Sequence, residues 1–227
     1  MAMPFYVPPE QMMKDRADYA RKNIARGRDV VALSATDGIV IVTENQFRTL
    51  FKISEIYDRI AFAGVGKYNE FEMLRAAGVR QADLKGYSFA REDVNARALA
   101  NAYGQTLGQV FTHEMKPYEV EILLAEVHDR QEDDELYRIL YDGIVMDDES
   151  TTVLGGRAER IAEQLATRFD PGMDSAAAIR LGASVLSDTD EPLTTNLEVA
   201  MLLRGVAGRS FRRITGEQLD AILTSSD

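Results

Sequence analysis

Lys52 is the residue of this chain whose type and surroundings most suggest chemistry. It lies in a largely apolar segment, residues 50–56, where the alternation of a strand would put it on the same face as Leu50 and Ile56. A lysine in such a place most often lays its aliphatic stem on apolar neighbours and keeps its ammonium group in water. The spacing favours this interpretation, and a site that binds an anion is the alternative.

Metal and thiol chemistry find little support in the sequence. The chain has no cysteine, so disulfides, thiol nucleophiles and cysteine-rich zinc sites are excluded. Its two histidines, His113 and His128, show no ligand-like spacing, and we expect them at the end of a helix and in a loop. The sequence therefore predicts no metal site and no cofactor.

A glycine-rich turn offers only a weak phosphate-binding signal. Gly64, Gly66 and Lys67 follow an expected strand and open an expected helix, but they match neither common nucleotide-binding pattern. No Gly-x-Ser-x-Gly sequence is present, so a serine hydrolase has no nucleophile elbow here. Nucleotide binding and serine-based hydrolysis are both disfavoured.

The composition indicates an ordinary globular protein. With 227 residues, 45% of them hydrophobic and 28% charged, the chain suits one large domain. The net charge of −11 opposes binding to nucleic acid or to an anionic membrane, and no apolar run is long enough for a membrane span. Together with the absence of cysteine, this favours a cytoplasmic protein.

The stretch from Lys14 to Arg28 is basic within this acidic chain. It carries six basic side chains against two aspartates. A solvated helix face is the default interpretation, and a docking surface for an acidic partner is the alternative.

Periodicity predicts the elements that must position these residues. Apolar residues at helical spacing predict a helix over residues 9–26. Continuous β-branched runs predict a hairpin of strands at 30–33 and 39–42 that is buried on both faces. Similar patterns predict strands at 51–56, 59–65 and 118–127, and helices at 67–77 and 91–115.

The rest of the chain continues the same mixture. Strands at 136–141 and 144–146 flank Asp142 and Gly143, a pair that favours a tight type I′ hairpin. A strand is expected at 151–154, a helix through 161–169 and another at 176–186, late strands at 197–203 and 210–214, and a closing helix at 216–223. Strands that are apolar on both faces need a sheet on one side and helices on the other, so the pattern predicts a layered α+β sandwich.

Six segments, in this order along the chain, closely resemble the α subunits of the actinobacterial 20S proteasome: residues 28–33, 52–60, 64–71, 116–121, 136–139 and 211–216. The resemblance covers nearly the whole chain. It implies the Ntn-hydrolase fold, a four-layer αββα sandwich with an extra N-terminal helix at residues 9–26. It also implies a single domain over residues 9–227.

The same family contains catalytic β subunits, in which an N-terminal threonine supplies both the nucleophile and the base. Here the corresponding position is held by about Arg28, and an amphipathic helix precedes it. Glu44 matches the carboxylate that ends the second strand in catalytic members, and Lys52 matches their catalytic lysine. Without the threonine, the resemblance implies a structural and regulatory subunit with no catalytic residue.

The resemblance further implies a docking pocket and a gate. In this family, activator ATPases insert C-terminal tails into pockets between adjacent α subunits, where a lysine meets the terminal carboxylate. Lys52 matches that lysine, and Gly66 and Lys67 match the neighbouring loop. Residues 1–8 would form the gate at the ring axis: Met1, Ala2, Met3, Pro4, Phe5, Tyr6, Val7 and Pro8.

The partners implied are other α subunits in a sevenfold ring, proteasome β subunits, a ring-shaped ATPase activator and unfolded protein substrates. The implied function is to control substrate entry to the threonine protease of the β subunits. Two alternatives stay open on the residues: a self-standing Ntn hydrolase, and a protein that binds a small anion at the turn of residues 64–67.

Overall fold

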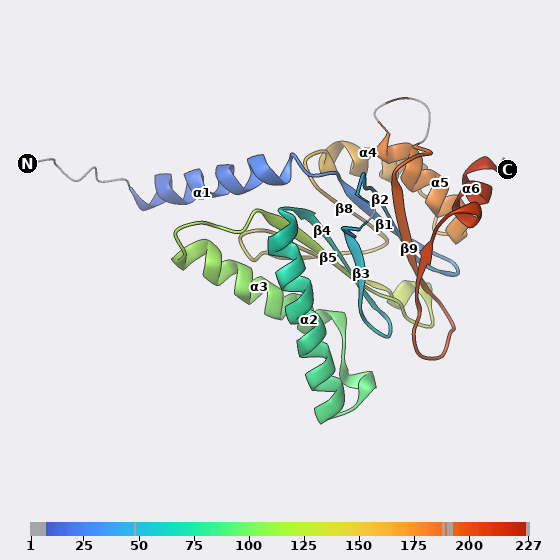
Figure 1. Cartoon of the computed structure of the whole chain (residues 1–227), viewed down its shortest axis with the longest axis horizontal. Coiled ribbons are helices and arrows are strands. Elements are labelled where there is room, and N and C mark those ends of the chain that lie inside the picture. Colours follow the sequence, from blue (N-terminus) through green and yellow to red (C-terminus); the bar gives the residue numbers. More distant parts are fainter. Residues whose placement is uncertain (1–7, 48, 188, 190–192, 226–227) are drawn as a thin grey trace, which may run out of the picture.

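Two five-stranded antiparallel sheets form the centre of the molecule (Figure 1). The computed structural model describes residues 8–47, 49–187, 189 and 193–225, so residues 1–7 of the expected gate lie outside the described part. The first sheet has the strand order β10-β9-β2-β1-β8 and the second has the order β3-β4-β5-β6-β7.

The strands of the first sheet are β1 (Val30–Ala35), β2 (Gly38–Glu44), β8 (Thr151–Leu154), β9 (Leu197–Leu203) and β10 (Phe211–Ile214). Those of the second sheet are β3 (Ile53–Tyr57), β4 (Ile60–Gly66), β5 (Val120–Glu126), β6 (Glu135–Ile139) and β7 (Val145–Asp148). The helices are α1 (Pro9–Ile24), α2 (Tyr68–Ser88), α3 (Ala96–His113), α4 (Ala158–Arg168), α5 (Ser175–Leu186) and α6 (Glu217–Thr224). None of the helices in the described ranges has the length and apolar character that a bilayer crossing requires.

Three apolar cores hold the layers together. The first lies between the two sheets, the second lies between the first sheet and α4, α5 and α6, and the third lies between the second sheet and α2 and α3. The order of helices, sheet, sheet and helices confirms the αββα sandwich.

The hairpin of β1 and β2 is buried on both faces, as the sequence predicts. Along β1, Val30 and Ala32 belong to the core between the sheets, whereas Val31 and Leu33 belong to the core under the helices. A strand placed between a sheet and a helical layer has no solvent face, which is why its sequence lacks alternation.

Helix α1 confirms the N-terminal helix and ends at Ile24. Pro9 fits the first helical position because the amide hydrogen that it lacks is not needed there. Ala20 and Ile24 are buried, where the helix contacts β4 and β5. Toward its amino end α1 extends away from the sandwich (Figure 1).

Helix α2 is longer than predicted. The sequence suggests an end near residue 77, before Gly78, yet the helix continues to Ser88. A side chain at Gly78 would collide with the hydroxyl of Tyr103 on α3, and one at Gly86 would collide with the hydroxyl of Tyr57. These glycines permit close packing inside the helix and do not end it.

Helix α3 starts later than predicted. The expected start near Arg91 forms a short 3₁₀ turn, Arg91–Asp93. The α-helix begins at Ala96 because the side chain of Asn95 caps it by accepting a hydrogen bond from the Ala98 amide.

The connection between β6 and β7 is not the predicted type I′ turn. The Gly143 amide donates to the Leu140 carbonyl at 2.9 Å, and the Leu140 amide donates to the Ile144 carbonyl at 2.9 Å. Gly143 has a φ of 88° while Asp142 does not have a positive φ, whereas type I′ needs positive φ at both central residues. The loop is therefore longer than a two-residue hairpin loop and consists of a turn followed by Gly143, whose φ is positive.

The two sheets are also joined just beyond the end of β9. Arg204 donates to the carboxylate of Asp134 at 2.7 Å and to the carbonyl of His128 at 2.6 Å, and both of these residues lie in the connection between β5 and β6. The Asp134 side chain is fully buried and that of Arg204 is 10% exposed. This ion pair therefore crosses from one sheet to the other inside the protein.

Candidate anion-binding site around Lys52

A cavity of about 550 Å³ lies beside Lys52, and its walls come from the segments that follow α1 and β2 and from the start of α2. Its charged lining consists of the cationic residues Arg26, Arg28 and Lys52 and the carboxylate Glu44. Apolar surface is supplied by Phe47, Leu50 and Phe71. Two residues of the basic stretch that follows Lys14 thus line a cavity and are not part of a solvated helix face.

The ammonium group of Lys52 points inward. Lys52 precedes β3, which begins at Ile53, so strand alternation does not apply to it. Its Nζ donates to the carbonyl of Arg28 at 2.5 Å and to the hydroxyl of Thr43 at 3.3 Å. The favoured prediction of an ammonium group in water is therefore wrong, and the geometry supports the anion-site alternative.

The environment makes this lysine unusually easy to deprotonate. Burial lowers the pKa of Lys52 to about 8, because the charged form is poorly solvated there. The negative charges of Glu198, Asp29 and Glu44 act in the opposite direction and limit the fall. The group remains mainly charged at neutral pH, as an anion site requires.

Gly66 lines the same cavity as Lys52, whereas Lys67 does not. Gly66 has a φ of 111°, and a Cβ atom there would meet the carbonyl of Glu119, so only glycine fits. Lys67 turns toward Glu70, with 3.6 Å between Nζ and Oε1. The structure thus brings together two of the three residues expected at the pocket.

The position expected to correspond to the catalytic threonine carries no hydroxyl group. Arg28 there forms an ion pair with Glu44 at 3.3 Å. The nearest hydroxyl to the Lys52 ammonium in the described residues, that of Thr43, donates to the Asp29 carbonyl at 2.7 Å. This arrangement can bind an anion, but the Thr43 hydroxyl already donates to the backbone.

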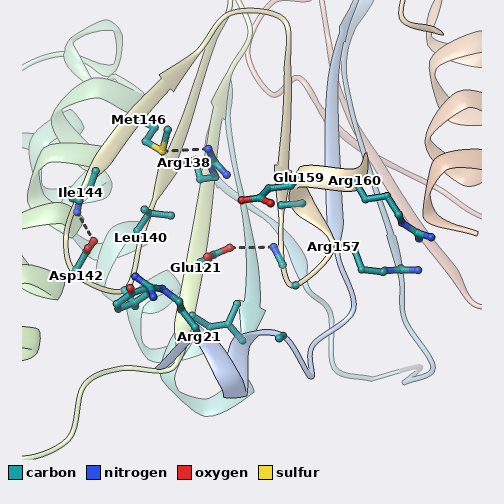
Figure 2. Close-up of a pocket in the computed structure, with 16 residues that line it drawn as sticks. Arg21, Glu121, Arg138, Leu140, Asp142, Ile144, Met146, Arg157, Glu159 and Arg160 are labelled. Atoms are coloured by element: carbon teal, nitrogen blue, oxygen red, sulfur yellow. Dashed lines mark hydrogen bonds between the residues drawn. The ribbon is translucent and has the colours of Figure 1, made fainter. Parts of the chain in front are cut away.

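A larger cavity, of about 740 Å³, lies beside the carboxyl end of α1 (Figure 2). Side chains of both charges line it, among them Arg21, Arg138 and Glu121. Glu121 accepts a hydrogen bond from the Gly155 amide at 3.0 Å, and burial raises its pKa. The mixture of charges selects no single class of ligand, so the Lys52 cavity remains the stronger candidate.

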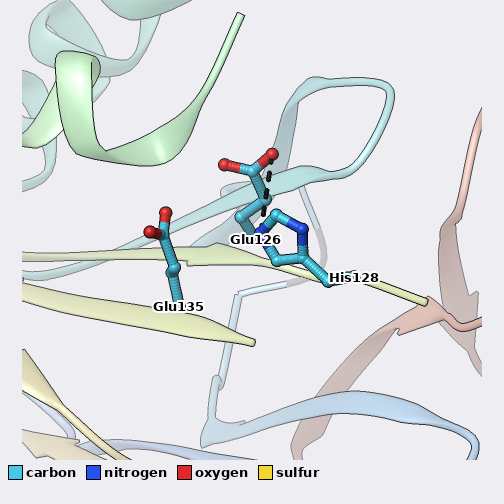
Figure 3. Close-up of side chains that lie close together, drawn as sticks. All are labelled: Glu126, His128 and Glu135. Carbon is cyan, nitrogen blue, oxygen red and sulfur yellow. Dashed lines mark ion pairs between the residues drawn. The ribbon is translucent and has the colours of Figure 1, made fainter. Parts of the chain in front are cut away.

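Possible metal ligands meet at a second place that the sequence analysis missed. Glu126, His128 and Glu135 bring their ligand atoms within 4.8 Å of one another (Figure 3). Glu126 and Glu135 face each other in the β5–β6 register, and His128 follows two residues after Glu126. Only the strand register could have revealed this group.

Protein cations already meet the charges of these two carboxylates. Glu126 lies 3.7 Å from the guanidinium group of Arg59, and Glu135 lies 3.1 Å from that of Arg97. The Ala96 amide also donates to Glu126 at 2.6 Å, while burial raises the pKa of this carboxyl. These ion pairs account for the two carboxylates, while the buried Nε2 of His128 has no hydrogen-bond partner among the described residues. With both carboxylates paired, we assign no metal to the group.

Comparison with known proteins places these features in a family. The family model described as "Proteasome subunit" matches residues 24–202. The chain is similar to the "Proteasome subunit alpha" of Sanguibacter keddieii, with 56% identity covering 99% of this chain and 91% of the relative. It is also similar to proteins of the same name from Kineococcus radiotolerans, with 54% identity covering 100% of both chains, and from Thermobifida fusca, with 53% identity covering 98% of this chain and 91% of the relative.

Proposed function

Because the chain belongs to the proteasome family as a non-catalytic α subunit, we propose that its Lys52 cavity receives the C-terminal tail of a ring ATPase activator. The alternative of a self-standing Ntn hydrolase is wrong, since the catalytic activity of this complex belongs to the β subunits. The observation that carries the proposal is the inward ammonium group of Lys52 in a cavity with two arginines.

The geometry suits a terminal carboxylate in particular. A lysine ammonium group has three donors, and two of those of Lys52 are used by Arg28 and Thr43. The third is available for a charge-assisted hydrogen bond to a carboxylate, which is stronger than a bond between neutral groups. Arg26 and Arg28 add positive charge around the same cavity.

The cavity also suits the peptide that carries such a carboxylate. Gly27 and Gly66 line part of it with main-chain atoms. Phe47, Leu50 and Phe71 offer apolar surface to the side chains of the peptide. A small free anion would use the charges but would leave this apolar surface unoccupied.

Replacement of Lys52 by alanine tests the docking proposal. We expect Lys52→Ala to weaken activator-stimulated degradation of a protein substrate about tenfold or more, because a charge-assisted hydrogen bond is lost. Hydrolysis of short peptides by a core whose gate has been removed should change little. The measurement is the rate of both reactions in core particles assembled with β subunits.

Lys67→Ala is the matched control, because Lys67 is paired with Glu70 outside the cavity lining. It should leave both rates close to those of the unmodified core. Equal loss of both reactions in Lys52→Ala would contradict the docking proposal and indicate a general defect in assembly.

We extend the proposal to the assembly. The chain would form a sevenfold ring with other α subunits, cap a ring of β subunits in the cytoplasm, and admit unfolded protein substrates. Helix α1 supports this arrangement, because its amino end extends from the sandwich (Figure 1) and its residues Met12 and Tyr19 are exposed to a neighbour.

Residues 1–8 would close the ring axis as a gate. Pro8 caps α1 without a side-chain hydrogen bond, and the other gate residues lie outside the described part of the chain. Deletion of residues 1–8 should raise the basal hydrolysis of a fluorogenic peptide several-fold, because the axial path would open. An unchanged basal rate in fully assembled particles would show that this segment is not the gate.

A further inference from the structure

A carboxylate from the first sheet holds the segment that carries Lys52. Glu198 lies on β9, and its side chain is 7% exposed. Its Oε2 accepts a hydrogen bond from the Lys52 amide at 3.0 Å, and its Oε1 accepts one from the Ile53 amide at 2.9 Å. Two consecutive backbone amides at the start of β3 thus donate hydrogen bonds to one side chain that comes from the other sheet.

The same carboxylate also accepts hydrogen bonds from two side chains, Asn45 and Arg213, that themselves bind the backbone of this segment. The side-chain amide of Asn45 donates to its Oε2 at 2.6 Å and to the Leu50 carbonyl at 2.8 Å. Arg213 donates to its Oε1 at 3.1 Å and to the Ile53 carbonyl at 2.6 Å. Each oxygen of Glu198 therefore accepts two hydrogen bonds, and residues 50–53 are fixed from both directions.

We propose that Glu198 is the positioning residue of the Lys52 site. By holding the backbone amides of residues 52 and 53, it keeps the Lys52 ammonium group against the Arg28 carbonyl, inside the cavity. The identity of the ligand rests on the proposed function, but the positioning itself does not. A carboxylate that served only to balance charge would not need to accept bonds from two consecutive amides.

Two substitutions of Glu198 separate the effect of the position of its carboxylate from the effect of its negative charge. Glu198→Asp keeps the negative charge but withdraws the carboxylate by one methylene group, so it can no longer reach all four donors. Glu198→Gln keeps the length but leaves one acceptor oxygen, with an amide NH₂ group facing the remaining donors. In both variants we expect the segment to relax and the Lys52 ammonium group to move toward water.

The pH at which Lys52 becomes reactive reports its location without any ligand. Competitive labelling of the intact chain with acetic anhydride, read by mass spectrometry across pH, gives the midpoint for this amine. The midpoint should lie near the pKa of about 8 in the unmodified chain. In Glu198→Asp it should rise by about one pH unit or more, because release from burial is the largest effect on this group. In Glu198→Gln the rise should be smaller, because this substitution also removes a negative charge that raises the pKa of Lys52.

Asp134→Asn is the matched control. Asp134 is another buried carboxylate that accepts several hydrogen bonds, including those of Ser34 and Arg204, but it contacts no part of the Lys52 segment. Its substitution should leave the Lys52 midpoint in place. A rise in this control equal to that in the Glu198 variants would mean that general loosening is responsible, and would overturn the proposal.

The direction of the shift decides the outcome. A midpoint that stays the same or falls in Glu198→Asp would overturn the positioning role. If Glu198→Asp fails to fold, as circular dichroism would show, the same criterion applies to Glu198→Gln. If the midpoint rises while activator-stimulated degradation is unaffected, the docking function is wrong and the positioning role stands.

Discussion

At the scale of the residue, Lys52 combines a buried position with a charge that the proposed docking requires. Burial outweighs the attraction of three nearby carboxylates, so the pKa of its ammonium group falls below the ordinary value for lysine. The charge is present below about pH 8 and is lost as the pH rises through that value. Any interaction that depends on this charge should follow the same course.

Tail docking should therefore weaken in mild alkali. We expect the affinity of the assembled core for a tail peptide with a free C-terminal carboxylate to fall as the pH rises from about 7 to 9. Above the pKa of about 8, the charged fraction of Lys52 drops about tenfold for each further pH unit. Fluorescence anisotropy of a labelled peptide across this pH range would measure the effect.

Lys52→Arg provides the control, because an arginine side chain does not lose its proton in this range. Whatever its affinity at pH 7, this variant should show no decline between pH 7 and 9. A decline of the same size in Lys52→Arg would place the titrating group elsewhere.

The sequence could identify Lys52 as a candidate site residue, but it could not show in which direction the ammonium group of Lys52 points. Its partners are the carbonyl of Arg28 and the hydroxyl of Thr43, and alternation within one strand carries no information about groups on other segments. Glu198 is a similar case, since its role depends on a contact between β9 of the first sheet and β3 of the second. Residue types suggest chemistry, whereas tertiary contacts decide which chemistry is possible.

At the scale of the element, the sequence predicts strands and helices well where burial is simple. The strand Thr151–Leu154 matches the prediction, because its apolar run is bounded by clear turn residues. Predictions fail where one residue type has two uses, as with the glycines of α2. Gly78 weakens a helix by propensity, yet packing against Tyr103 requires it.

This conflict makes Gly78→Ala informative. A methyl group there would overlap the Tyr103 hydroxyl, which donates to the Leu74 carbonyl at 2.9 Å. We expect the free energy of unfolding to fall by about 1 to 3 kcal/mol, because overpacking in the core outweighs the gain in helix propensity. Thermal or denaturant unfolding would measure the change.

Gly108→Ala is the comparison on the neighbouring helix. An added Cβ atom there would be 3.5 Å from the Asp142 carbonyl, which is ordinary contact. Here propensity should prevail, and stability should stay the same or rise by up to about 1 kcal/mol. Equal destabilisation by both substitutions would show that close packing at Gly78 is not the reason.

At the scale of the whole molecule, a largely apolar hollow lies beside α1, with Asp15, Arg16 and Lys116 also in its lining. Met12, Tyr19, Met115 and Pro117 line it, and the side chain of Met115 is almost fully exposed. An exposed apolar surface next to an element that leaves the body of the protein is typical of a contact with another subunit. The ring proposed above would cover it.

A charge placed in this hollow should impair assembly. We expect Met115→Glu to reduce the yield of complete particles about tenfold, since a carboxylate buried in a largely apolar subunit contact loses its hydration. Native mass spectrometry of chains co-expressed with β subunits would give the distribution of complexes.

Val206→Glu is the control, because Val206 is an exposed apolar residue in the connection between β9 and β10, away from α1. It should leave assembly near normal. If Met115→Glu assembled as readily as Val206→Glu, the hollow would not be a subunit contact.

Hydrogen bonds connect strand β9 to the opposite sheet at both of its ends. Glu198 accepts them near the start of the strand, and Arg204 donates them just after its end. Separating the two sheets would break the ion pair of Arg204 with Asp134 and the hydrogen bonds from the Lys52 and Ile53 amides to Glu198. Partly unfolded states in which the two sheets have separated are therefore high in free energy, and the sandwich should unfold in a single cooperative transition. The backbone amides of β9 should be among the last to exchange their hydrogen atoms with solvent.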